Sequence, residues 1–482
     1  MKKISAWLGS FAFATALGWT SWVAAQNQTG TLSPILSSNG VPFRIQIEEA
    51  GFSLPSGLQS YVMATHRGKW LLLAGRFNGL HGFNPNGNFP PNTQNTTVFV
   101  VDPNLQTVST RSLTNLESGL TQAQIDLLSV TGAQSFQSGK TLYMSGGFGV
   151  DTATTNFTTK AALTAIDVPG LIHWVVDPTN GETAVQHIRQ VFDPLFQITG
   201  GAMVEASPHH ALLVFGQNFS GDNVFADGTY SEQIRPFRIK DNGKQLSFVA
   251  KPALPATPDP DYRRGNLNVV PIVERGRQGF VAFSGAFTPT FGIWTVPVEI
   301  QRNGISTMAD PTDTATFAQG MNNWACPTLQ LYSHKEKNSY TVLMGGISFG
   351  FFASGVFETD AELPFINQVT TIKRDRDGVF SQYLMDGEYP VILSTGSNPG
   401  NQLLFGAGAT LIPVDGLPRY KNGVLKLDAL GSGPVVVGYI VGGIQSTLPN
   451  TNTSADTAAS PYIFKVTLVP APSSDGCPNC TQ

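Results

Sequence analysis

The chain contains an apolar run that closes on glycine six times. The closing glycines are Gly75, Gly147, Gly216, Gly285, Gly346 and Gly443. They lie 72, 69, 69, 61 and 97 residues apart, and self-similarity at such a period indicates a repeat architecture. The runs are continuous rather than alternating, so each predicts a strand that is covered on both faces.

Each run is surrounded by signals for three more strands. A short strand and a tight polar turn, such as residues 66–69 or 334–337, come before the run. A Gly- and Asn-rich loop and a third strand, such as residues 97–102, follow it, and a fourth strand is plausible at sites such as 106–113. Four strands per repeat is the content of one propeller blade. We therefore predict an all-β, six-bladed β-propeller over residues 43–468.

The two ends of the chain complement each other. The sixth repeat has no fourth strand, while residues 43–49 form a strand pattern that precedes the first repeat. We predict that this N-terminal strand completes the last blade and closes the ring, which removes exposed sheet edges. The long last spacing is consistent with a degenerate seventh repeat around 403–414, giving seven blades, but we favour an insertion at 386–430.

The run endings carry a resemblance to a known family. The pairs Gly146 and Gly147, Gly345 and Gly346, and Gly442 and Gly443 end runs as kelch motifs do, and residues 367–375 match the following Asn-x-Val strand that ends in Asp. The chain resembles an exported bacterial kelch-like propeller of the galactose-oxidase central-domain type, in a group without known activity. The copper site of galactose oxidase has no matching residue set here. Function does not follow from such a fold.

The N-terminal residues have the layout of a signal peptide. Lys2 and Lys3 precede an apolar stretch over 6–17 and small residues at 23–25, so we expect residues 1–25 to be removed. Residues 26–42 then form a linker and 469–482 a flexible tail. No later stretch is long and apolar enough for a membrane span. We expect a secreted protein, periplasmic or extracellular.

Composition narrows the class of partner. Apolar residues make up 41% of the chain and charged residues 13%, with 50 Gly and 32 Pro, which is typical of a turn-rich β protein. Without residues 1–25 the chain has 27 basic and 33 acidic residues, a formal charge of −6. A negative net charge does not favour binding to the phosphate backbone of nucleic acids. We expect a monomer.

Cysteine use is sparse for an exported protein. Cys477 and Cys480 form a CPNC motif in the Pro-rich tail, where a local disulfide is favoured over a redox site because redox CxxC motifs begin helices beside a sheet. Cys326 then stays unpaired, as a small buried residue.

Candidate ligand-binding residues come from long loops that the topology gathers on one face. They are Arg76, Asn78, His81, Asp261, Tyr262, Arg263, Arg264 and Trp324. Guanidinium groups bind carboxylates bidentately and aromatic faces stack on sugar rings. The alternative for 259–264 is a solvated loop with internal Asp–Arg pairs.

The other polar clusters favour structural roles. His209 and His210 lie in a tight turn on the opposite face, where we expect no metal. The Asn- and Asp-rich loops at 84–92 and 220–223 could hold Ca²⁺, but they lack a regular ligand spacing, and turn chemistry explains them. We expect no cofactor.

These observations predict a binding scaffold rather than naming a reaction. No nucleophile-elbow, zincin, P-loop or dinucleotide motif occurs in a fitting context. The leading hypothesis is a secreted propeller that binds a glycan or a surface protein on its long-loop face. The alternative is a carbohydrate-active enzyme, such as a sugar epimerase or mutarotase, with Asp261 as base and His81 and the arginines on the substrate. Whether the chain catalyses a reaction stays open.

Overall fold

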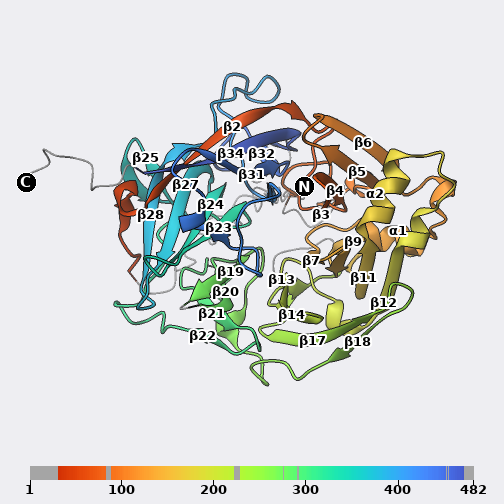
Figure 1. The fold of residues 1–482 in the computed structure, drawn as a ribbon, viewed down its shortest axis with the longest axis horizontal. Helices are drawn as coiled ribbons and strands as arrows, with labels where there is room; N and C mark the ends of the chain where they lie inside the picture. Colours follow the sequence, from red (N-terminus) through yellow and green to blue (C-terminus); the bar gives the residue numbers. More distant parts are fainter. Residues whose placement is uncertain are drawn as a thin grey trace, which may run out of the picture.

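The fold is a β-propeller in which sheets surround a common centre (Figure 1). The computed structural model describes residues 31–471 except 83–87, 222–227, 275, 290–291, 452 and 454. The expected signal peptide, together with Cys477 and Cys480, lies outside the described residues. The described α-helices are α1 (Gln122–Leu128) and α2 (Val168–Val176).

Five sheets are four-stranded antiparallel blades. From the inner to the outer strand, blade 1 comprises β3 (Val62–His66), β4 (Lys69–Leu73), β5 (Thr97–Asp102) and β6 (Thr107–Ser112). Blade 2 comprises β7 (Gln134–Ser138), β8 (Thr141–Ser145), β11 (Ala162–Asp167) and β12 (Ile188–Phe192). Blade 3 comprises β13 (Ala202–Ser207), β14 (His210–Val214), β17 (Ile234–Asp241) and β18 (Leu246–Ala250). Blade 4 comprises β19 (Asn268–Glu274), β20 (Arg277–Phe283), β21 (Val298–Gln301) and β22 (Ser306–Met308). The closing blade comprises β29 (Thr410–Pro413), β31 (Val435–Val441), β34 (Tyr462–Pro470) and β2 (Phe43–Ser53).

The fifth repeat forms a wider sheet. Its own strands are β23 (Thr328–Ser333), β24 (Asn338–Ile347), β27 (Phe365–Arg374) and β28 (Phe380–Glu388). At the outer edge β1 (Ile35–Ser37), from the expected linker, pairs in parallel with β28, and at the inner edge β30 (Leu425–Lys426) pairs in parallel with β23. The prediction of six four-stranded blades, or of seven, is therefore wrong: the structure has five blades of that kind, and a six-stranded sheet fills the remaining sector of the ring. The reason is that both edges of this sheet accept extra strands.

Smaller elements lie between the strands of the sheets. Two-stranded hairpins are formed by β9 (Phe148–Asp151) with β10 (Asn156–Thr159), β15 (Gln217–Asn218) with β16 (Thr229–Tyr230), β25 (Gly350–Ala353) with β26 (Val356–Thr359), and β32 (Ile444–Ser446) with β33 (Thr457–Ala459). The short 3-10 helices are η1 (Ser38–Gly40), η2 (Pro91–Thr93), η3 (Leu116–Ser118), η4 (Ala184–His187), η5 (Pro194–Phe196), η6 (Pro260–Tyr262) and η7 (Leu427–Ala429).

Closing glycines fasten one sheet to the next through backbone hydrogen bonds, which are present at Gly75, Gly147, Gly216, Gly346 and Gly443. The backbone N–H of Gly75 donates to the carbonyl of Val130 at 2.7 Å, and that of Gly443 donates to the carbonyl of Leu58 at 2.9 Å. In both cases the acceptor lies just before the inner strand of the following blade. Gly443 has a φ of 88°, and a Cβ there would lie 2.6 Å from the Cβ of Ala409. Glycine recurs at this position because the backbone is left-handed and a Cβ would meet the segment that leads into the inner strand of the same blade.

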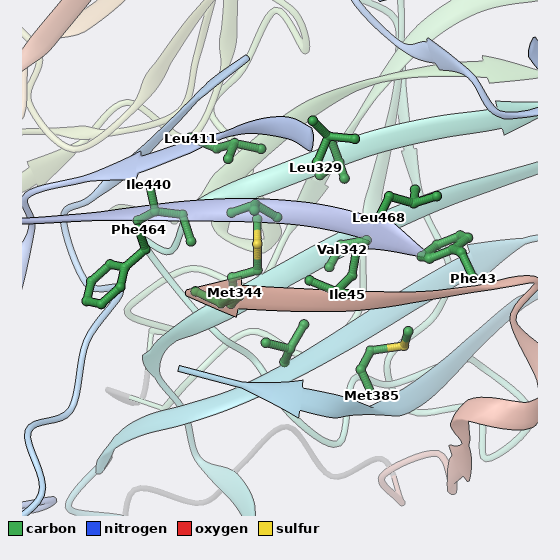
Figure 2. Packing of buried hydrophobic residues seen from close by; sticks show 14 of the residues in the cluster. Phe43, Ile45, Leu329, Val342, Met344, Met385, Leu411, Ile440, Phe464 and Leu468 are labelled. Carbon is green, nitrogen blue, oxygen red and sulfur yellow. The ribbon is translucent and has the colours of Figure 1, made fainter. Parts of the chain in front are cut away.

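The N-terminal strand closes the ring, as the sequence predicted. β2 pairs antiparallel with β34, from Phe43 opposite Pro470 to Ser53 opposite Tyr462. Phe43 and Ile45 are buried against strands of the closing blade and of the six-stranded sheet (Figure 2). The two ends of the chain are thereby joined through backbone hydrogen bonds and a shared apolar core.

The long spacing before Gly443 holds an excursion of the chain. β29 is the inner strand of the closing blade, and the tight turn expected after an inner strand is replaced by residues 414–434, which include β30 and η7. The Asp428 carboxylate accepts a hydrogen bond from the Ser333 hydroxyl at 2.8 Å and one from the backbone N–H of Lys335 at 3.0 Å. Within the described residues no sheet corresponds to a seventh repeat.

A substitution pair tests the contact at the closing glycine. Gly443→Ala should destabilise the fold by about 1–3 kcal/mol more than Gly431→Ala, because overpacking adds to backbone strain only at Gly443. Gly431 has a similar φ of 82°, but no neighbouring atom lies within 4 Å of the position that a Cβ would take there. Equal losses in urea unfolding would contradict the close approach of Ala409 as the reason for glycine at this position.

Candidate functional site

The long loops lie together on one face of the ring. We call it the long-loop face; it carries the four two-stranded hairpins and the segments that lead into the inner strands. The opposite, tight-turn face carries the turns between β3 and β4, β7 and β8, and β13 and β14. The hairpins are joined across blades, since Thr158 bridges to Ser220 and Asn78 bridges to Ala458. The long-loop face is thus a hydrogen-bonded second layer above the blades.

Arg76 is buried beneath this layer. It is 1% exposed, its Nε donates to Asn78 Oδ1 at 2.9 Å, and a terminal nitrogen donates to the Pro90 carbonyl at 3.0 Å and to the Thr93 hydroxyl. The guanidinium also lies over the Phe89 ring at 4.9 Å. Burial lowers the pKa of Arg76 to about 10. These contacts hold the loop of blade 1 in place.

His81 stacks beside this arginine. Its ring centroid lies 4.6 Å from that of Phe89, and its Nδ1 lies 2.7 Å from the Gly82 carbonyl oxygen. Burial and, to a smaller extent, the charge of Arg76 lower the pKa of His81 to about 4, although the hydrogen bond with the Gly82 carbonyl acts in the opposite direction. The imidazole is therefore neutral at neutral pH.

The segment that leads into blade 4 places its predicted site residues in different environments. Residues 260–262 form η6, whose first turn is capped by the Asp259 side chain. Tyr262 is buried, stacks near Phe215 and accepts a hydrogen bond from the Ser306 hydroxyl at 3.0 Å. Asp261 is exposed, and its pKa is raised by partial desolvation and by Asp259.

The adjacent arginines have different surroundings. Arg264 is fully buried, lies over the Trp294 ring at 4.4 Å and donates to the Ser284 carbonyl at 3.2 Å, and burial lowers its pKa to about 9. Arg263 is half-buried, lies over the Tyr230 ring at 3.9 Å and donates to the Phe287 carbonyl at 2.8 Å. Arg264 is part of the core, whereas Arg263 lies at the surface of the long-loop face.

Trp324 extends the group around Arg263. Its ring meets that of Phe287 edge to face, with centroids 6.1 Å apart, and its backbone N–H donates to the Ile347 carbonyl. Tyr230, Arg263, Phe287 and Trp324 thus form a continuous group, which we call the aromatic row. The sequence analysis predicted Arg263 and Trp324 as site residues but missed Tyr230 and Phe287. The sequence signal for Phe287 was its position two residues after a closing glycine, at the start of a long loop.

The predicted residues therefore form two groups. Arg76, Asn78 and His81 are joined in blade 1, and Arg263 and Trp324 are joined through Phe287. No contact among the described residues links His81 to Asp261, whose charged neighbours are Asp259, Arg264 and Asp310. The acid and base that the enzyme hypothesis requires are not brought together by these contacts.

Exposed apolar side chains on the long-loop face were also missed. Val356 and Phe357, on β26, are 62% and 36% exposed, and Val391 and Leu393 are 72% and 54% exposed in the segment after β28. The hairpin was expected only as a long loop. The apolar pairs Phe351-Phe352 and Val356-Phe357 on either side of a Ser-Gly turn were the sequence signal for this hairpin.

The described residues include no metal-binding cluster and one buried free cysteine. Among the described residues, no three His, Cys, Asp or Glu side chains are arranged to hold a metal ion. Both Ca²⁺ candidate loops include residues outside the described part. Cys326 is a buried free thiol, and burial raises its pKa to about 12. No helix in the described part is long and apolar enough to cross a membrane.

Comparisons with known proteins assign no activity. No family model and no curated protein matches the chain. Among solved structures, one described as "Structure of YjhT" is 12% identical, with a TM-score of 0.44, over 86% of this chain and 98% of that chain. A similarity of this size is distant and transfers neither substrate nor residue roles.

The neutral His81 ring makes stability depend on pH. Because the folded pKa lies below the ordinary value of 6.5, the unfolded chain binds the proton more readily, so stability should fall as pH drops from about 6.5 to about 4. Urea unfolding should show that the free energy of unfolding decreases less between pH 7.5 and pH 4.5 for His81→Gln than for the unmodified chain. His334→Gln, at an exposed histidine, should leave the loss unchanged. Identical pH dependence in all three proteins would contradict the lowered pKa of His81.

Proposed function

We propose that this chain is an exported, non-enzymatic binding scaffold that docks a protein partner on its long-loop face. The observation that carries the proposal is a set of exposed apolar side chains on a fixed hairpin of that face. Exposed apolar surface is one feature by which protein interaction sites are recognised.

The hairpin is held rigidly. Gln368 of β27 accepts a hydrogen bond from the backbone N–H of Phe352 at 2.9 Å and donates to the carbonyl of the same residue at 2.7 Å. The Phe352 and Phe357 rings pack edge to face at 5.4 Å, and Phe357 lies against Gly350. An apolar element that is already ordered loses little entropy when it docks.

The segment beside the closing blade is fixed as well. Asn398 donates to the Asp456 carboxylate and to the Thr447 hydroxyl, both at 2.9 Å, and Leu393 bridges to Gln402. Val391 and Leu393 are aliphatic, and aliphatic side chains do not stack on sugar rings. This chemistry favours a protein partner over a glycan for this sector.

A glycan remains the second candidate, at the aromatic row. Its support is the half-buried pair of Arg263 and Trp324, which together offer a cation and aromatic surface at the same face.

The protein-docking proposal predicts site-specific cross-linking. A photo-cross-linking amino acid at Phe357 or Leu393, in cells that express the chain, should give one discrete protein adduct. The same group at Leu105, which is 70% exposed in the turn between β5 and β6 on the other face, should give none. Phe357→Ser with Leu393→Ser should weaken binding of that partner about tenfold or more. Equal adducts from all three positions, or none from any, would overturn the proposal.

If a glycan binds at the aromatic row, glycan binding should depend on Arg263 and Trp324. Purified protein should bind a defined set of glycans on an array, and Trp324→Ala or Arg263→Ala should abolish the signal while Arg238→Ala, at an exposed arginine of β17, preserves it. Binding that survives both substitutions would exclude the aromatic row.

A further inference from the structure

A pocket of about 200 Å³ lies between blades 2 and 3 on the tight-turn face, away from the long-loop face. Phe136, Ser138, Thr141 and Tyr143 come from the β7–β8 hairpin of blade 2, while Glu205 and Asp241 come from blade 3. The sequence pattern indicated only tight turns here. His209, set aside as a turn residue, also lines the pocket.

The floor of the pocket is an inter-blade ion pair without net charge. Arg189 donates through Nε to Asp241 Oδ1 at 3.0 Å and through a terminal nitrogen to Oδ2 at 2.7 Å. Both side chains are almost fully covered, at 11% and 4% exposure. Burial raises the pKa of Asp241, but hydrogen bonds from Arg189 and the Gly243 N–H outweigh it, so the pKa lies below its ordinary value. Asp241 stays ionised and neutralises Arg189.

The aromatic wall adds a hydroxyl to this floor. The Tyr143 hydroxyl donates to Asp241 Oδ2 at 3.1 Å, and burial together with the Asp241 charge raises the Tyr143 pKa to about 12. Tyr143 therefore keeps its proton. Its ring packs beside that of Phe136, with centroids 5.4 Å apart. This pair presents aromatic surface next to polar groups.

The opposite wall holds an open acceptor. Glu205 Oε1 accepts hydrogen bonds from the Ser138 hydroxyl at 2.9 Å and from the His209 backbone N–H at 3.4 Å. Within the described residues the other oxygen, Oε2, has no hydrogen-bond partner. Ser138 and Thr141 are cross-strand neighbours at the end of the hairpin and bring two hydroxyls to the same pocket.

These groups select a ligand class. A neutralised arginine and a remaining carboxylate disfavour an anion, because the carboxylate would face it unpaired. A carboxylate oxygen, hydroxyls and an aromatic wall together suit a neutral polyol, whose hydroxyls donate to the acceptor while its C–H face lies on the ring. The volume is below the roughly 300–1,000 Å³ of pockets for drug-sized ligands, so it suits a single ring.

We propose that the pocket between blades 2 and 3 binds one neutral monosaccharide unit, with Glu205 as the principal acceptor. This site goes beyond the proposed docking on the long-loop face and does not depend on it.

Titration calorimetry of the whole mature chain with D-glucose, D-galactose and D-mannose tests the site, with D-glucuronate as the charged counterpart. At least one neutral sugar should bind, and D-glucuronate should not. Glu205→Gln and Ser138→Ala should each weaken that binding about tenfold or more, because the first replaces the charged acceptor and the second removes a hydroxyl that lines the pocket. Glu117→Gln, at an exposed glutamate outside the pocket, is the matched control and should change nothing.

The outcomes separate this site from the long-loop face. An array of glycans that end in the bound sugar shows whether the pocket binds that sugar as the terminal unit of a glycan or only as a free sugar. If Glu205→Gln abolishes binding to the array and Trp324→Ala does not, the binding is assigned to this pocket. Unchanged melting temperatures in Ser138→Ala keep the result independent of folding. The proposal is overturned if no neutral sugar binds, if binding survives both pocket variants, or if only a charged probe binds.

Discussion

The hydrogen bond from a closing glycine to the next blade is the contact on which the rest of the structure depends. It forms only because two successive residues at the end of the second strand, such as Gly146 at φ 62° and Gly147 at 84°, adopt left-handed backbone. The bend turns the chain away from the sheet, and the Gly147 N–H reaches the Ile198 carbonyl at 2.8 Å. The loop that follows must then lie on the face where the next blade begins. The gathering of the long loops on one face is a consequence of this geometry.

Ring closure relies on apolar burial more than on charge. The ion pairs along β2, Glu48 with Lys465 and Arg44 with Asp386, lie at the surface and contribute little. Phe43, Ile45 and Ile47 are buried between the closing blade and the six-stranded sheet, and β2 adds a full antiparallel ladder to β34. The seam joins residues far apart in sequence, so it forms only when both ends of the chain are present.

The arginines of the long-loop face illustrate how tertiary packing changes the meaning of a residue. Arg76 and Arg264 each lie over an aromatic ring and donate to backbone carbonyls, which makes them supports for the loops around them. Arg263 differs from Arg264 by one position but is only half-buried, on the long-loop face. The proposed ligand contacts therefore lie at the half-buried Arg263 with its aromatic neighbours and, on the other face, at Glu205.

The sequence by itself determined the repeat, the strands and the closing role of β2, since each depends on local signals: apolar runs, tight turns and glycines with left-handed backbone. It also placed the long loops on one face. Only the tertiary structure decided that the fifth repeat gains β1 and β30, that Arg264 is buried while Arg263 is not, and that Ser138 meets Glu205 across two blades. These outcomes depend on contacts between segments tens to hundreds of residues apart, such as the 67 residues between Ser138 and Glu205. Local sequence patterns do not predict which distant residues come into contact, because burial and strand pairing depend on the packing of the whole ring.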